Sequence, residues 1–121
     1  VVPSRESVLA LKGRVALEMG RVNEAFADLQ AALKLDPRHV KARIDLGMVF
    51  LIRHDYERAH ATFSQLIAES PDGAVYYGRA LANHGLRNKA AALADIENAI
   101  RLTPEKNPML SEWHSRIRAM P

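Results

Sequence analysis

Proline recurs at a nearly constant interval along the whole chain, and this repetition constrains the fold more than any other feature. Pro3, Pro37, Pro71 and Pro104 are 34, 34 and 33 residues apart. Three further columns recur in register between the prolines: Ala25, Ala59 and Ala92; Leu29, Phe63 and Ile96; Ala32, Leu66 and Ala99. A period of this length indicates a stack of similar units, each of which buries its apolar face against its neighbours.

Each unit is predicted to be a hairpin of two amphipathic helices, and residues 40–71 show this most clearly. The apolar positions of each half fall on one helical face: Leu46, Gly47 and Phe50 in the first, and Ala59, Phe63, Leu66 and Ile67 in the second. Asp55 stands between the halves, where a helix N-cap acceptor is needed. Pro71 ends the second helix.

These columns resemble the tetratricopeptide repeat (TPR) family, a 34-residue helix–turn–helix with small residues at its eighth and twentieth places and proline at its thirty-second. In repeat 6–39 the pattern falls on Leu9, Gly13, Gly20, Ala25, Leu29, Ala32 and Pro37, and in repeat 40–73 on Leu46, Gly47, Phe50, Tyr56, Ala59, Phe63 and Pro71. Lys12, Ala16 and His54 depart from it. The resemblance implies an all-α right-handed solenoid of three such hairpins.

The third repeat, residues 74–104, can be read in two registers. One places Tyr77, Gly78, Leu81 and Gly85 at the family's first-helix positions, with a loop after Pro71 about three residues short and an inter-helix turn about two residues long. The other places Ala80 at the small-residue position and buries Arg79 and Asn83. We favour the first register, because it leaves these two polar side chains unburied. In it Asn88 caps the second helix.

The two ends of the chain differ. Residues 107–120 predict a seventh, capping helix, which begins with Asn107 and Pro108 and carries a single apolar stripe of Leu110, Trp113, Ile117 and Met120. At the other end, Ser4 is expected to cap a first helix whose apolar stripe is Val8, Leu9, Leu11 and Val15. Pro3 lies where the proline of an earlier repeat would fall. We therefore expect residues 1–121 to form one domain excised from a longer protein.

Composition narrows the function classes. A chain of 121 residues that is 48% hydrophobic fits one domain, and a net charge of +3 is compatible with an acidic partner without requiring one. The absence of cysteine excludes disulfides and zinc thiolate sites. There is no signal peptide and no apolar run of about 18 residues that would insert into a membrane. A soluble fragment is expected, and its compartment is not determined.

In the TPR family, the first helices of successive repeats line a concave groove that binds partner segments. The resemblance nominates a partner-binding groove of Arg14, Lys41, Ile44, Asp45, Met48, Ile52, Tyr76, Arg79 and Asn83. Ile44, Met48 and Ile52 form a second apolar line on their helix, which is typical of a binding surface. Nearby basic residues favour a partner that combines apolar anchors with carboxylates. The alternative is that these apolar residues pack internally and the charges are only solvated.

Some family members grip a C-terminal carboxylate with Lys, Asn and Arg at five groove positions. Here we assign those positions to Ala10, Arg14, Asp45, Asp72 and Tyr76, so this clamp is absent. Asp45 would repel such a terminus. A chaperone tail is therefore not the expected ligand.

No other group of residues indicates a metal, catalytic or nucleic-acid-binding site. The five histidines show no metal-ligand spacing beside a suitable acid, no carboxylate pair is set apart for acid–base work, and basic residues and aromatics are too dispersed for nucleic acid. We expect no cofactor, no metal and no nucleic acid. The sequence thus predicts a non-catalytic protein-interaction module that binds a partner peptide or helix. The rivals are a structural segment that self-associates and, less favoured, an accessory domain of an enzyme.

Overall fold

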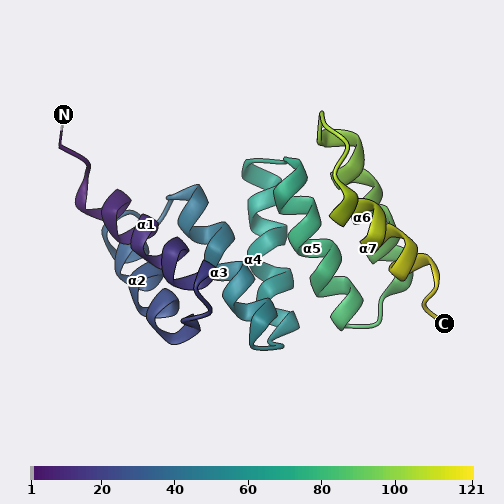
Figure 1. Cartoon of the computed structure of the whole chain (residues 1–121), viewed down its shortest axis with the longest axis horizontal. Helices are drawn as coiled ribbons and strands as arrows, with labels where there is room; N and C mark the ends of the chain where they lie inside the picture. The colour runs from purple at the N-terminus through teal and green to yellow at the C-terminus, as the bar shows by residue number, and fades with distance from the viewer. Residues whose placement is uncertain (1) are drawn as a thin grey trace.

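The computed structural model describes residues 2–121, and these form seven helices joined by short loops. They are α1 (Arg5–Glu18), α2 (Val22–Leu35), α3 (Val40–Ile52), α4 (Tyr56–Glu69), α5 (Gly73–Gly85), α6 (Lys89–Leu102) and α7 (Pro108–Arg118). Figure 1 shows them as an elongated row that runs from α1 to α7 in chain order. The described residues contain no strand, and the predicted all-α helical-repeat solenoid is confirmed. None of these helices is both long enough and apolar enough to cross a membrane.

The loops set where each helix begins. Six helices start at a side chain that accepts a hydrogen bond from a backbone N–H of the first turn: Ser4, His39, Asp55, Asp72, Asn88 and Asn107. Within each hairpin the connecting turn is three residues long. Its middle residue has a positive φ: 77° at Gly20, 59° at His54 and 62° at Arg87. All three hairpins therefore reverse direction through the same kind of turn.

The favoured register of the third repeat is wrong, and the alternative is right. Because the turn of the third hairpin has the usual length, Ala80 takes the small-residue position and is fully buried, as is nearly all of Asn83. Only the loop before α5 differs, since it has three residues (70–72) where the preceding repeat junction has four (36–39). The half-buried Arg79 and the buried Asn83 are tolerated because α6 supplies Asp95 as their partner.

Small residues let the helices approach one another in the core. Gly47 and Gly78 lie on two sides of the Phe63 ring, and a Cβ on either glycine would overlap the ring. Phe63 is itself fully buried, as are Leu29 and Ile96 at the same place in the other repeats. Burying a side chain of this kind contributes about 2–3 kcal/mol. The repeated glycine and large apolar columns thus form the contacts that join α-helices within and between hairpins.

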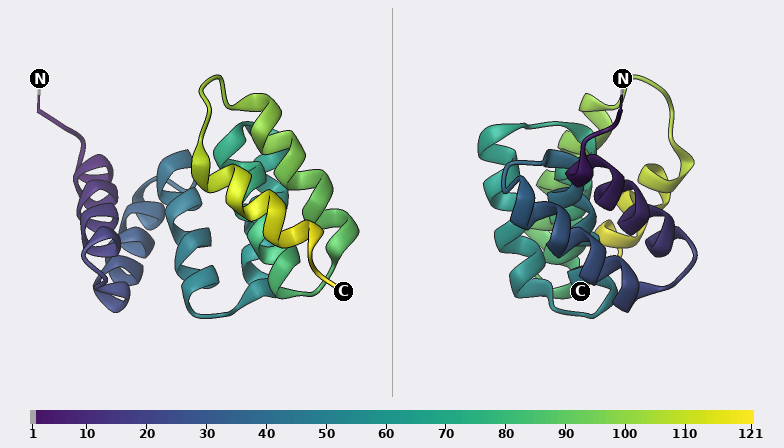
Figure 2. Two further views of the ribbon diagram at one scale, coloured as in Figure 1. Left: turned by 45° about the vertical axis from the view of Figure 1, so that its right-hand side comes forward. Right: turned by 90° about the vertical axis from the view of Figure 1, so that its left-hand side faces the viewer.

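The array is curved because its two layers of helices are unequally spaced. α1 contacts α3 and α3 contacts α5, whereas α2, α4 and α6 make almost no contact with one another. The first helices therefore line the inner side, and Figure 2 shows them from two further directions. α7 packs on α6 at the end of the row, with Leu110 and Ile117 buried as predicted for the capping helix.

The first helix departs from the expected packing. Val8, Leu11 and Val15, which we expected to face the core, are all exposed, while Ala10, Gly13 and Ala16 face inward. The small residues are the ones that allow α2 to approach, since a Cβ on Gly13 would overlap Leu29. Among the larger apolar side chains of α1, Leu9 and Leu17 pack against the core cluster of the first hairpin, whereas Val8, Leu11 and Val15 do not.

Candidate peptide-binding groove

Three adjoining hollows run along the inner side of the array and together form one groove. The first, which we call the basic cleft, has a volume of about 370 Å³ and is lined by Ser7, Ala10, Leu11, Arg14, His39, Lys41 and Asp45. The central trench, of about 610 Å³, shares Arg14, Lys41 and Asp45 with the cleft and adds residues that include Leu17, Ile44 and Met48. The apolar pocket, of about 330 Å³, shares Met48 with the trench. These shared lining residues make the groove continuous.

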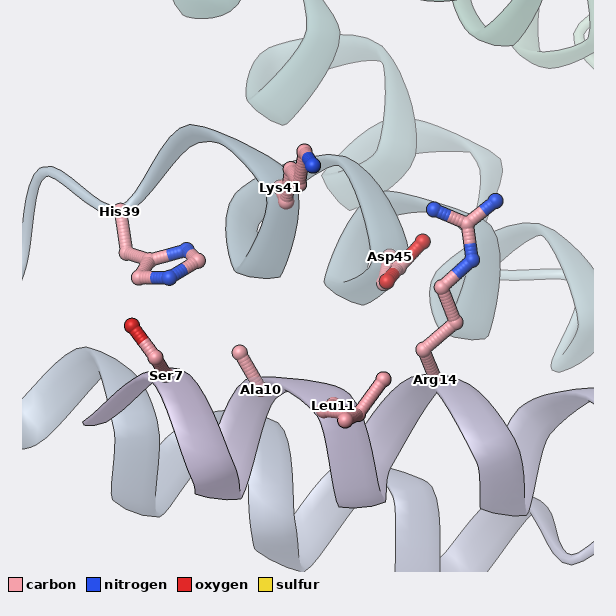
Figure 3. A pocket seen from close by; sticks show the side chains of 7 residues that line it. All are labelled: Ser7, Ala10, Leu11, Arg14, His39, Lys41 and Asp45. Carbon is pink, nitrogen blue, oxygen red and sulfur yellow. The ribbon is translucent and has the colours of Figure 1, made fainter. Parts of the chain in front are cut away.

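The basic cleft lies between α1 and the first turn of α3 (Figure 3). His39 is fixed there because its Nδ1 accepts a hydrogen bond from the Ala42 backbone N–H at 3.2 Å, which also caps α3. Lys41 is exposed and forms no ion pair within residues 2–121. The side chains of Arg14 and Asp45 point toward each other across the cleft. The cleft therefore presents two permanent cations and one carboxylate.

Asp45 gives this end of the groove its mixed electrostatics. Its side chain is on the groove wall but the residue is only 7% exposed. Burial raises the pKa of its carboxyl group, and the nearby charge of Arg14 opposes that shift. Arg14 in turn has Glu18 one helical turn away, with Nε 3.6 Å from the carboxylate Oε1. Of the cleft's cations, Lys41 is therefore the one free to meet a carboxylate from a partner.

The apolar pocket lies at the other end of the groove, where α3, α5 and α7 converge. Its walls are Met48, Leu51, Ile52, His54, Tyr56, Leu81, His84 and Trp113. Aromatic contacts hold its rim, since His54 stacks on Tyr56 at 5.6 Å and Trp113 meets His84 edge-on at 5.1 Å between ring centroids. The pocket presents mostly carbon to the groove and suits an aliphatic or aromatic side chain.

Six of the predicted groove residues come together and three do not. Arg14, Lys41, Ile44, Asp45, Met48 and Ile52 all line the groove. Tyr76, Arg79 and Asn83 line none of its three hollows, and placing them there was wrong. Tyr76 packs with the core cluster of the third repeat. Asn83 is 2% exposed and, like Arg79, donates to Asp95.

The wrong register of the third repeat also explains which groove residues the sequence analysis missed. With α5 beginning at Gly73, its groove face carries Leu81 and His84 in place of Arg79 and Asn83. The signal for the correct register was the constant three-residue turn, which counts back from Asn88 to the end of α5. Trp113 was expected to serve only the core of the cap, whereas it also forms a wall of the apolar pocket.

The corrected register leaves the carboxylate clamp absent. Its last two positions now fall on Ala74 and Gly78 instead of Asp72 and Tyr76, and neither residue carries a charge. Together with Ala10 and Asp45 in the preceding repeats, they leave Arg14 as the one cation among the five positions. The groove consequently lacks the set of donors that grips a free C-terminus.

The stacked hairpins and the groove along their first helices define a helical-repeat protein of the solenoid type. Family models described as tetratricopeptide repeat match residues 16–83 and 73–106. The second match begins at Gly73, the first residue of α5. The chain belongs to the tetratricopeptide repeat family.

Individual relatives agree with this assignment. Human tetratricopeptide repeat protein 13 is 32% identical over 93 residues, which are 73% of this chain and 10% of that protein, so the chain spans about a tenth of the relative's length. Among solved structures, the Arabidopsis OM64 TPR domain is 22% identical, with a TM-score of 0.85 and 93% of each chain covered. The first TPR of Spaghetti (RPAP3), described as bound to HSP90 peptide SRMEEVD, is 19% identical, with a TM-score of 0.85 and coverage of 98% of this chain and 94% of that one. These solved structures share the fold.

Proposed function

We propose that this chain is a non-catalytic protein-interaction module that binds a segment of a partner protein along the groove. The observation that carries the proposal is the continuity of the basic cleft, central trench and apolar pocket on one side of the array. Packed helices hold the groove open before a partner arrives, so binding costs little ordering of the module itself. A structural neighbour described as bound to a peptide supports the same mode.

The two ends of the groove favour a partner segment with an acidic residue and an apolar residue in a set order. Lys41 and Ile52 stand near the two ends of α3, 11 residues apart, which corresponds to about 16 Å along a helix axis. An extended partner rises about 3.3 Å per residue, so about five residues span that distance. The acidic side chain would meet Lys41, and the apolar side chain would enter the pocket beside Met48 and Trp113.

The chain provides its own reporter for this binding. Trp113 is the single tryptophan of the chain and forms a wall of the apolar pocket, so an entering side chain should change its fluorescence. The probe is a panel of eight-residue peptides with a glutamate and a leucine about five residues apart. Matched peptides reverse the order, replace glutamate by lysine, or replace leucine by serine. The proposal requires tighter binding of the parent peptide than of any matched peptide.

Two variants link the signal to the groove. Lys41→Glu should weaken the glutamate peptide by about tenfold, the value expected for one charge-assisted contact. Met48→Ala should weaken all peptides that carry leucine. The controls are Lys34→Glu and Met109→Ala, which make the same changes on exposed positions of α2 and α7. Equal binding by all four variants would contradict the proposal.

The same variants also test whether the chain self-associates through the groove. If the groove were a seam between two copies, sedimentation at rising concentration would show a dimer that Met48→Ala dissolves. In that case added peptide would compete with the dimer instead of binding to a monomer. This outcome would replace the peptide-binding proposal with a structural one.

A further inference from the structure

The outward face of α1 carries a stripe of exposed apolar side chains, of which only Leu11 also lines the groove. Val8, Leu11, Val15 and Met19 are 44%, 64%, 46% and 60% exposed. Three of them line an open hollow of about 320 Å³ that reaches across to Glu24 and Asp28 on α2. We call this surface the first-hairpin end face. Four large apolar side chains on one exposed stripe mark an interaction surface.

The repeat itself shows what covers this kind of face. By position in the repeat, Val8, Leu11 and Val15 correspond to Ala42, Asp45 and Val49 on α3 and to Val75, Gly78 and Ala82 on α5. All six corresponding residues are buried. Ala42 and Val49 belong to the core cluster of the first hairpin, and Val75 and Ala82 to that of the second. In both cases the covering element is therefore the preceding hairpin.

A second copy of the chain does not offer a matching surface for head-to-tail stacking. The corresponding surface at the other end of the array, on α6, is already covered by α7. Most outward positions of α7 are polar, with Glu112, Arg116 and Arg118 exposed, and Met109 is the exposed apolar residue of this helix. Ile100, Leu102 and Met109 are exposed at that end, but α7 occupies the surface against which a following hairpin would pack.

We propose that the first-hairpin end face seats a further helix hairpin of the same repeat type, contributed by the polypeptide directly upstream of Pro3. Pro3 supports the position, because Pro37, Pro71 and Pro104 each follow the second helix of a hairpin at the same place. The contact is mainly apolar, since the charged groups at its rim are already paired. Lys12 lies 4.0 Å from Asp28 and Arg21 lies 3.9 Å from Glu24.

The shape of the first-hairpin end face constrains one residue of the proposed upstream hairpin. Leu29, Phe63 and Ile96 each lie eight residues before the proline of their repeat. Phe63 packs so closely on Gly78 of the next hairpin that any Cβ there would overlap its ring. Leu11 of α1 corresponds to Gly78 of α5 by position in the repeat. Its side chain occupies the space that a ring like that of Phe63 would need. The upstream residue eight places before Pro3 should therefore be small, such as alanine, and not phenylalanine.

The chain's lack of cysteine makes the proposal directly testable. Leu11→Cys places a single thiol on the end face, and Met109→Cys places a matched exposed thiol at the far end of the array. Each is made in residues 1–121 alone and in a polypeptide that also includes about 40 upstream residues, with any upstream cysteine changed to serine. The measurement is the rate at which a maleimide labels the folded protein.

The expected result is a difference confined to one thiol in one polypeptide. In residues 1–121 alone both thiols should label at similar rates. In the longer polypeptide the Leu11→Cys thiol should label about 100-fold more slowly, because labelling then requires local opening, while the Met109→Cys rate stays unchanged. Equal labelling of Leu11→Cys in both polypeptides would overturn the proposal. So would concentration-dependent protection of that thiol in residues 1–121 alone, since it would assign the face to a second copy.

Discussion

The buried polar cluster of the third repeat allows the most detailed prediction. Asp95 is 3% exposed and accepts hydrogen bonds from Arg79 Nε at 2.8 Å, from Arg79 Nη2 at 2.9 Å and from Asn83 Nδ2 at 2.9 Å. Arg79 also donates from Nη1 to the Ser64 hydroxyl at 3.4 Å. The bonds to Asp95 raise the pKa of the Arg79 guanidinium. The cluster therefore joins α5 to α6 through the Asp95 carboxylate and α5 to α4 through the Arg79 guanidinium.

Asp95→Ala removes this carboxylate and leaves a charged guanidinium without its partner. Breaking a buried ion pair from one side costs about 3–5 kcal/mol. The Arg79 side chain is 26% exposed, so water can replace part of the lost interaction. We therefore expect a loss of about 2–4 kcal/mol in the free energy of unfolding. With a urea slope of about 2 kcal/mol per M, the unfolding midpoint falls by about 1–2 M.

The assay follows urea unfolding by circular dichroism for the whole chain and by Trp113 fluorescence for the end formed by α5, α6 and α7. A triple variant with Arg79→Met, Asn83→Leu and Asp95→Leu is the essential comparison. Replacing a complete buried polar group by apolar side chains is often neutral or stabilising, so this variant should lie close to the wild type. A loss below about 1 kcal/mol for Asp95→Ala, or a triple variant as unstable as the single one, would refute the reasoning.

Three further predictions follow from individual contacts. Gly78→Ala forces a Cβ against Phe63, and we expect a net loss of about 1–2 kcal/mol in thermal or urea unfolding, because crowding outweighs the gain in helix propensity. Asp45→Asn should stabilise the protein at pH 7, and the gain should vanish as the pH falls below 3.8, because burial raises the folded-state pKa of this carboxyl above its ordinary value. Glu69→Gln should destabilise the protein at neutral pH, and the loss should shrink as the pH falls below 4.5, because the hydrogen bond from Arg43 lowers the pKa of Glu69. Urea midpoints across pH would check the sign of both effects.

Much of the fold was predictable because residues that cap helices and form turns recur in each repeat. Each helix boundary is set by a nearby cap or turn residue, such as Asp55 or Asn88, and these act within a few residues of sequence. The groove residues of α3 were predicted for a related reason. A regular helix fixes which side chains share a face, so Lys41, Met48 and Ile52 follow once the repeat position is known.

The tertiary structure decided three matters that local patterns leave open. The turn before Asn88 indicates the register of α5, but that register turns Arg79 and Asn83 inward, and only the structure shows that Asp95 on another helix pairs with them. The pocket at the end of the groove depended on how α7 crosses the array and brings Trp113 beside Leu81.

The outward stripe of α1 is the third. Its amphipathic spacing shows only that Leu11 belongs on an apolar face and cannot show which neighbour covers that face. Periodicity along one helix fixes side-chain direction, but the free energy of burying a side chain is set by atoms that are distant in the sequence. For that reason this sequence determined the helices and their repeat, while the three-dimensional packing decided the register, the pocket and the open end.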